Sequence, residues 1–260
     1  MLNVLELFSG THSVGKCCES LGWNVVSLDL ELPADHQIDI MNFDYKQYPK
    51  DYFDIIWASP PCVYYSNLQN CWLGRKKKDG IILTKELLEE HRKESDKLIR
   101  KTLEIIDYFK PELWFMENPQ RGQLKDREVV KGLNYYDVSY CMYSDWGYEK
   151  RTRIWTNKKN WNNLICDKSG SCGNMIEIPT DGALRHDTGK PLKCATRKLH
   201  NNLLCKSESL KAIRKHKKVC DGGYDKRKKN SNCVQNVGSG TNRLERYRIP
   251  PDLIYSLFLD

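Results

Sequence analysis

Short apolar runs alternate with amphipathic stretches over the first 157 residues of the chain. The apolar runs are typical of buried β-strands, and they cover residues 2–8, 23–30, 52–58, 113–117, 136–141 and 153–156. Helical periodicity predicts one helix from Val14 to Leu21 and a longer one from Thr84 to Phe109, which Pro111 ends. Strands that alternate with helices predict an α/β fold with a mostly parallel, doubly wound sheet covered on both faces.

The pattern changes after residue 157. Residues 158–240 are rich in Asn, Lys and Ser and contain few apolar runs, so little regular structure is expected there except around Ser207 to Val219. The pattern recovers near the end, where RYRIPPDLIYSLFLD predicts an amphipathic helix that begins at a proline. We therefore divide the chain into a core of residues 1–157, a small irregular region of residues 158–240 and a terminal segment of residues 241–260.

Composition indicates a soluble globular protein. Of the 260 residues, 40% are hydrophobic and 29% are charged, and no apolar run approaches the roughly 20 residues that span a bilayer. The start MLNVLELFSG lacks the pattern of a signal peptide. We expect an intracellular monomer that makes no membrane contact, and we expect its eleven cysteines to be reduced.

The positive charge is concentrated in one segment. Residues 185–230 carry 15 Lys+Arg against 4 Asp+Glu, a local charge of +11, and the formal net charge of +8 leaves −3 for the rest of the chain. A near-neutral body with one strongly basic segment is typical of a nucleic-acid-binding protein. A solvated basic surface without a partner is the alternative.

Unusual polar and turn residues follow four of the predicted strands. They are Ser9-Gly10, Asp29, Ser59-Pro60-Pro61-Cys62 and Glu117-Asn118-Pro119. Ligands of open α/β sheets bind beyond the carboxyl ends of the strands, so these residues mark a candidate site. The Asp29 carboxylate suits the hydroxyls of a ribose, and Asp39 could accept a hydrogen bond from an adenine amino group. Each could instead be a helix cap or a surface acid.

Cys62 is a candidate nucleophile. Two prolines directly after an apolar strand fix the backbone and hold the next side chain rigidly at the edge of the sheet. A cysteine in that place, followed by VYYSN, is poorly explained as core filling. A thiolate beside the Glu117 carboxylic acid suits covalent addition to an electrophilic ring, with the acid donating to a ring nitrogen.

In this order the motifs resemble those of the DNA (cytosine-5-)-methyltransferase family, and in particular its small phage and large-DNA-virus members. LELFSG resembles the first cofactor motif, SPPC the nucleophile loop, ENP the Glu-Asn-Val strand end, EKRTR the Gln-x-Arg-x-Arg motif, and RIPPDLIYSL the last motif, which returns to the cofactor site. The chain departs from the family at Thr11, His12 and Ser13, where glycines are usual, and at Glu149, where glutamine is usual.

The resemblance implies a Rossmann-like methyltransferase fold that binds S-adenosylmethionine, and it implies a covalent mechanism of methyl transfer. Cys62 would attack C6 of a flipped-out cytosine while Glu117 holds N3, and a methyl group would then pass from S-adenosylmethionine to C5. Arg151 and Arg153 would contact the base and the adjacent phosphate. The residues expected to line the cofactor are Phe8, Ser9, Gly10, Thr11, His12, Ser13, Asp29, Leu30, Asp39, Ile40, Ser59 and Pro60.

The resemblance assigns residues 158–240 to target recognition and makes double-stranded DNA the expected partner. Two alternatives stay open: a branch of the family methylates transfer RNA with the same residues, and an inactive relative could bind nucleic acid without catalysis. The cysteines and histidines of residues 166–233 could together form a zinc site. Because they contain no CxxC pair and no familiar spacing, we expect no metal.

Overall fold

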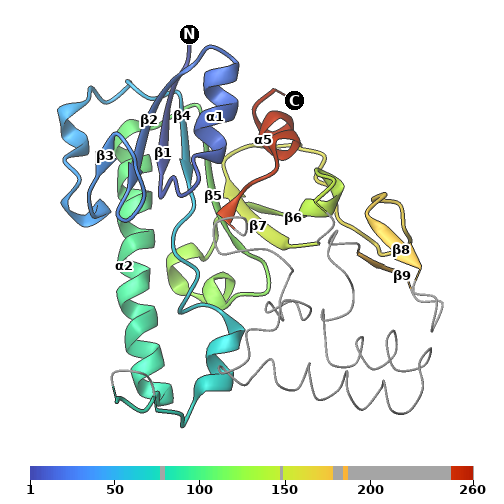
Figure 1. The fold of residues 1–260 in the computed structure, drawn as a ribbon. Coiled ribbons are helices and arrows are strands. Elements are labelled where there is room, and N and C mark those ends of the chain that lie inside the picture. Colours follow the sequence, from blue (N-terminus) through green and yellow to red (C-terminus); the bar gives the residue numbers. More distant parts are fainter. Residues whose placement is uncertain (77–79, 147–148, 178–183, 187–246, 260) are drawn as a thin grey trace. The chain divides into compact units, whose positions relative to one another are not determined.

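The computed structural model describes residues 1–76, 80–146, 149–177, 184–186 and 247–259 (Figure 1). The chain divides into two compact units. The first comprises Met1–Tyr143, Lys150–Ile165 and Arg248–Asp260, and the second comprises Ser144–Glu149 and Cys166–Tyr247. Every residue predicted to line the site belongs to the first unit.

The first unit is built on a seven-stranded sheet in the order β3-β2-β1-β4-β5-β7-β6. The strands are β1 (Asn3–Leu7), β2 (Asn24–Asp29), β3 (His36–Gln37), β4 (Ile55–Ala58), β5 (Leu113–Pro119), β6 (Tyr135–Ser139) and β7 (Arg151–Thr156). The first five strands pair in parallel, and β7 runs antiparallel between β5 and β6. The predicted mostly parallel, Rossmann-like sheet is confirmed, and β3 is a short edge strand that the sequence pattern did not predict.

Within the described residues, three α-helices accompany this sheet: α1 (Ser13–Ser20), α2 (Lys85–Phe109) and α5 (Pro251–Leu259). The long helix α2 begins where the Thr84 hydroxyl accepts a hydrogen bond from the Leu87 N–H, and it ends at Lys110 in a left-handed conformation before Pro111. Short 3₁₀ helices lie in the connections: η1 (Ile40–Asn42), η2 (Tyr45–Gln47), η3 (Asn67–Trp72), η4 (Gln123–Asp126), η5 (Glu128–Val130) and η6 (Tyr140–Met142).

Alternation along β1 explains how helices cover both faces of the sheet. Leu5 and Leu7 are fully buried in the main core cluster together with residues of α2. Glu6 points to the opposite face, because its carboxylate accepts hydrogen bonds from backbone N–H groups of α1. Figure 1 accordingly shows α1 and α2 on opposite sides of the strands. The predicted cover on both faces is therefore confirmed.

The C-terminal helix α5 completes the face that carries α1. Leu253, Ile254 and Leu257 of this helix are fully buried, and the Phe258 ring packs against Trp57 of β4 at a centroid distance of 6.2 Å. The Tyr255 hydroxyl lies 2.9 Å from the hydroxyl of Ser20 in α1. The two ends of the sequence are thereby joined in one core.

In the second unit, the described part includes the antiparallel pair β8 (Met175–Glu177) and β9 (Leu184–His186). The regular structure expected around Ser207 to Val219, the basic segment beyond residue 186 and the boundary at residue 240 lie outside the described residues. Among the described helices, none has the length and apolar character needed to cross a membrane.

Candidate active site

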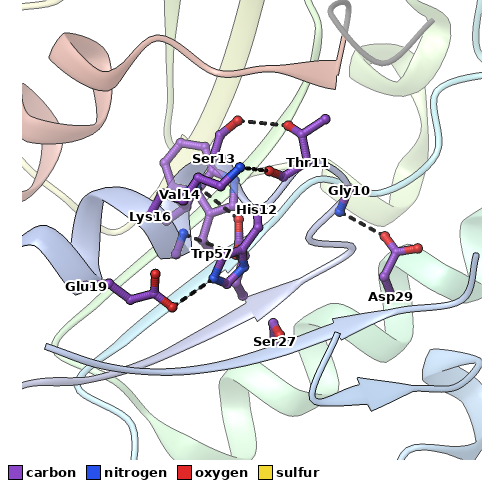
Figure 2. Close-up of polar contacts among 12 residues, drawn as sticks. Gly10, Thr11, His12, Ser13, Val14, Lys16, Glu19, Ser27, Asp29 and Trp57 are labelled. Atoms are coloured by element: carbon purple, nitrogen blue, oxygen red, sulfur yellow. Dashed lines mark hydrogen bonds and ion pairs between the residues drawn. The ribbon is translucent and has the colours of Figure 1, made fainter. Parts of the chain in front are cut away.

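The carboxyl ends of β1, β2, β4 and β5 lie at one edge of the sheet, because these strands are parallel. The turns after β1 and β2 are tied together there: the Gly10 N–H donates to Asp29 Oδ2 at 2.9 Å (Figure 2). The other oxygen of Asp29 accepts from the backbone N–H groups of Glu31 and Leu32, at 2.8 Å each. Asp29 thus fixes the loop at the end of β1 as well as its own turn.

His12 links this loop to the face of the sheet beneath it. Its Nδ1 lies 2.7 Å from Glu6 Oε2. Its Nε2 lies 3.1 Å from Glu19 Oε1 in α1 (Figure 2). The hydrogen bond to Glu6, followed by the charges of Glu6 and Glu19, raises the pKa of His12 to about 9, although burial opposes the rise. His12 is therefore an imidazolium at neutral pH.

Thr11 and Ser13 connect the same loop to the C-terminal segment. Their hydroxyl oxygens are 2.9 Å apart (Figure 2), and the Ser13 hydroxyl accepts from the Ile249 N–H at 3.3 Å. The last motif thus reaches the loop after β1, which is where the resemblance places the cofactor.

The other expected cofactor residues differ in accessibility. The Leu30 side chain is 60% exposed, whereas Ile40 is 2% exposed and belongs to the hydrophobic core. Asp39 caps η1 by accepting from the Met41 N–H. Ser59 accepts from the Trp57 indole N–H at 2.9 Å. Phe8 packs against the core in a left-handed conformation, with φ of 57°.

The chemistry of the loop after β1 fits a nucleoside cofactor. The Ser9 hydroxyl is buried and has no hydrogen-bond partner among the described residues. Asp29 Oδ2 accepts one backbone N–H, and a carboxylate oxygen has room for a second donor such as a ribose hydroxyl. The N-terminus of α1 follows directly, and helix N-termini favour negatively charged groups such as a carboxylate. The residues present therefore suit a ligand with a ribose and an amino-acid moiety.

The nucleophile loop and the end of β5 are tied by one hydrogen bond. Asn118 is fully buried, and its Nδ2 donates to the Pro60 carbonyl oxygen at 2.9 Å. Cys62 follows two residues later and is partly buried, and its carbonyl oxygen accepts from the Tyr65 N–H. Burial raises the pKa of the Cys62 thiol and the Glu117 carboxylate raises it further, whereas Lys150 opposes both. Glu117 and Lys150 are therefore the charged side chains that act on the Cys62 thiol.

Three donors surround the Glu117 carboxylate. Its Oε1 lies 3.3 Å from the Tyr140 hydroxyl, 3.4 Å from the Thr152 hydroxyl and 3.5 Å from the Lys150 ammonium. Glu117 is 7% exposed, so little water competes with these donors for the carboxylate. Such a carboxylate is oriented before any ligand arrives.

The two arginines of the EKRTR motif lie on the other side of β7. Arg153 stands opposite Asn118 in β5 and Asp137 in β6, and it makes a bidentate ion pair with the Asp137 carboxylate at 2.7 and 2.8 Å. Its guanidinium also lies over the Tyr135 ring, 3.6 Å from the centroid. Arg151 stands opposite Ser139 in β6.

Tyr140, Lys150 and Thr152 were not predicted from the sequence as neighbours of Glu117. The signal was present in the motif, because alternate residues of a strand point to opposite faces. If the arginines of EKRTR occupy one face, the lysine and threonine between them face the other. Tyr140 carries no such signal, because it lies in η6 after the strand that precedes the motif.

Comparison with known proteins finds clear sequence similarity to one viral protein. The chain is 40% identical over 187 residues to the probable DNA (cytosine-5)-methyltransferase of Frog virus 3 (isolate Goorha), and the match covers 71% of this chain and 84% of the viral protein. No protein-family model matches the chain.

Two solved structures show weaker likeness. The Entamoeba histolytica methyltransferase EhMeth is 13% identical with a TM-score of 0.48, over 99% of this chain and 98% of that one. The S. pombe Dnmt2 methyltransferase is 15% identical with a TM-score of 0.40, over 65% of this chain, which spans 54% of that protein. Because both TM-scores lie below 0.5, the assignment of the chain to a family rests on the similarity to the viral protein and not on these two structures.

Proposed function

Because this chain belongs to the DNA (cytosine-5)-methyltransferase family, we propose that it transfers a methyl group from S-adenosylmethionine to C5 of cytosine in double-stranded DNA. The observation that carries the proposal is the Asn118–Pro60 hydrogen bond, which ties the Cys62 loop to the strand end that bears Glu117. A thiol and an oriented carboxylate at the edge of a parallel sheet suit covalent catalysis on a ring.

Cys62 is the nucleophile in this proposal. Its sulfur forms a bond to C6 of the cytosine ring, and the thiol proton leaves to a base. That proton reaches the Glu117 carboxylate, which becomes a carboxylic acid, hydrogen-bonds the ring nitrogen N3 and protonates it as electron density moves into the ring. Because the carboxylate is already held by three donors, it needs little reorganisation at that moment. C5 of the adduct then takes the methyl group and loses its proton to a base, N3 returns its proton to Glu117, and elimination breaks the sulfur–carbon bond and restores Cys62.

The cofactor is held by the loop after β1 in this proposal. Asp29 receives the ribose hydroxyls, Asp39 faces the base, and the Ser9 hydroxyl donates to the ligand. S-adenosylmethionine supplies an electrophilic methyl group when bound. The target carbon of duplex DNA lies inside the base stack, so the cytosine must be flipped out to reach Cys62.

A labelled transfer assay tests the proposal. Purified full-length protein is incubated with methyl-labelled S-adenosylmethionine and, separately, with unmethylated duplex DNA and with transfer RNA. We expect label at cytosine C5 of DNA that disappears with Cys62→Ala. Cys71→Ala is the matched control, because Cys71 lies nine residues further on and is exposed; this variant should keep its activity.

The other outcomes separate the alternatives. Label in transfer RNA alone would assign the same chemistry to an RNA substrate. Cofactor binding without transfer to either substrate would indicate a binding protein. Transfer that survives Cys62→Ala would contradict the covalent mechanism.

A further inference from the structure

We propose that His12 is a positioning residue that holds residues 8–13, the cofactor loop, in its binding conformation by pairing with the buried Glu6 carboxylate. This inference rests on the proposed function, because it assigns the loop to S-adenosylmethionine. It concerns a position where this chain departs from the glycine that the family resemblance leads one to expect.

The backbone of the cofactor loop gives the first argument. Phe8, Gly10 and His12 have φ values of 57°, 56° and 56°, in the left-handed region. Glycine adopts this conformation without a penalty, whereas a residue with a side chain adopts it at a cost in free energy. Histidine at position 12 must therefore make a contact that offsets the cost.

Glu6 supplies that contact. It lies inside the apolar strand β1 and is 2% exposed, and its two oxygens accept from the Val14 and Gly15 N–H groups at 3.1 Å each. Glu6 thus caps α1 from a neighbouring strand, while His12 at the N-cap position makes no capping bond with its own side chain. A buried carboxylate also requires a cation, and the His12 ring at 2.7 Å provides it.

The absence of a side chain at Gly15 leaves space for the His12 ring beside α1. A Cβ atom built on Gly15 would overlap Nδ1, Cε1 and Nε2 of the His12 ring. Glycine is a poor residue inside a helix, so its presence on the first turn of α1 indicates that the space is needed. The imidazolium occupies that space between Glu6 and the helix.

The charges around His12 keep it protonated at neutral pH. Glu6 faces it from β1 and Glu19 from α1, and Asp35 interacts with it from the connection between β2 and β3. The nearby ammonium of Lys16 is directed to the Thr11 carbonyl oxygen at 3.0 Å. Because the pKa of His12 rises from 6.5 to about 9 on folding, its stabilising contribution is complete below pH 6.5 and is lost as the pH rises through about 9.

The experiment measures S-adenosylmethionine binding by calorimetry from pH 7 to pH 10, for the wild type and for His12→Gly. We expect His12→Gly to raise the dissociation constant about tenfold at pH 7. The ratio of the two constants should fall toward 1 above pH 9, where the wild type loses its imidazolium. Taking the ratio cancels the ionisation of the cofactor's own amino group, which titrates in the same range.

A double-mutant cycle gives a second, independent readout. Gly15→Ala should weaken binding in the wild type, because the new methyl group displaces the ring. In the His12→Gly background the same change meets no ring, so the two effects should not be additive. Glu128→Gln is the control, because Glu128 is 83% exposed and pairs with Lys131, and its substitution should change the dissociation constant by less than about twofold.

The measurements distinguish a failure of the proposed function from a failure of the role proposed for His12. Wild-type protein that does not bind S-adenosylmethionine at any pH overturns the proposed function itself. Wild-type binding with a ratio near 1 at pH 7, or with a ratio that stays constant to pH 10, overturns the role of His12. A Gly15→Ala effect of equal size in both backgrounds also contradicts it.

Discussion

The charges of Glu117 and Lys150 act in opposite directions on the reactivity of the Cys62 thiol. Burial and the Glu117 carboxylate raise the pKa of the Cys62 thiol, and Lys150 opposes the rise. Removing the ammonium in Lys150→Met should raise the pKa of Cys62 further, because the positive charge that favours the thiolate is lost. Iodoacetamide alkylates the thiolate, so the rate of Cys62 alkylation rises with pH as the thiol ionises. In Lys150→Met this rise should occur at a higher pH than in the wild type, as measured by mass spectrometry of the peptide that contains Cys62.

Lys159→Met provides the comparison for this prediction, because Lys159 is exposed. Its alkylation profile should match that of the wild type. A Lys150→Met profile that stays in place, or moves to lower pH, would show that the ammonium does not act on the thiol. Transfer to DNA should slow in Lys150→Met and should recover partly at high pH, where more of the thiol is ionised.

At the scale of elements, the segment after Cys62 is fixed to α2 by buried polar contacts. Tyr65 is fully buried, and its hydroxyl donates to Asp96 Oδ1 at 2.8 Å. Arg127 in turn binds Asp96 through two of its nitrogens. Removing the hydroxyl in Tyr65→Phe should lower the free energy of unfolding by about 1.5–3 kcal/mol, because the bond is to a charged group.

Urea unfolding of Tyr65→Phe and of Tyr64→Phe tests this prediction. Tyr64 is only partly buried and stacks on His91, so its substitution should change the free energy of unfolding by no more than about 0.5 kcal/mol. Equal losses in the two variants would contradict the assignment. Tyr65→Phe should also reduce methyl transfer, because Tyr65 is bonded through its backbone to Cys62 and Gln123.

The same elements show what the sequence could and could not predict. Apolar runs such as residues 52–58 and the long helix ending before Pro111 were found because burial and proline leave strong local signals. The two-residue strand β3 was missed because edge pairing to β2 defines it, and no local pattern does. The Asn118–Pro60 contact joins positions 58 residues apart. The His12–Glu6 contact is local, but it depends on the turn that folds the loop back onto β1, so residue types alone could not reveal either contact.

The C-terminal helix gives a further prediction about elements. Leu257 is fully buried in α5, whereas Tyr255 reaches Ser20 through an exposed hydrogen bond. Leu257→Ala should lower the free energy of unfolding by about 2–5 kcal/mol, because it leaves a cavity in the core shared with α1. Tyr255→Phe should cost no more than about 1 kcal/mol. Thermal or urea unfolding distinguishes the two, and similar losses would show that the helix is held by its polar contact.

At the scale of the whole molecule, charge separates the chemistry from the expected DNA contacts. The predicted site residues lie in the first unit, while the segment with a local charge of +11 lies in residues 185–230. Lysine and arginine that neutralise DNA phosphates release condensed counterions, so the affinity falls steeply with salt. Phosphate contacts from this segment would therefore set affinity without setting the chemistry at Cys62.

Changing four residues of the basic segment to glutamine tests whether this segment sets DNA affinity without affecting the cofactor site. The logarithm of the DNA association constant, plotted against the logarithm of salt concentration, should become shallower by about 0.9 for each replaced residue that contacts a phosphate. The residues are Lys226, Arg227, Lys228 and Lys229. S-adenosylmethionine binding should not change, because the cofactor loop lies in the first unit.

The matched control removes the same charge from the exposed surface of the first unit, at Lys46, Lys50, Lys93 and Lys97. If the +11 segment carries the phosphate contacts, this control should keep the wild-type salt slope despite an identical change in net charge. Equal slopes in the two variants would mean that net charge governs DNA affinity. A shallower slope in the control alone would move the phosphate contacts to the surface around α2.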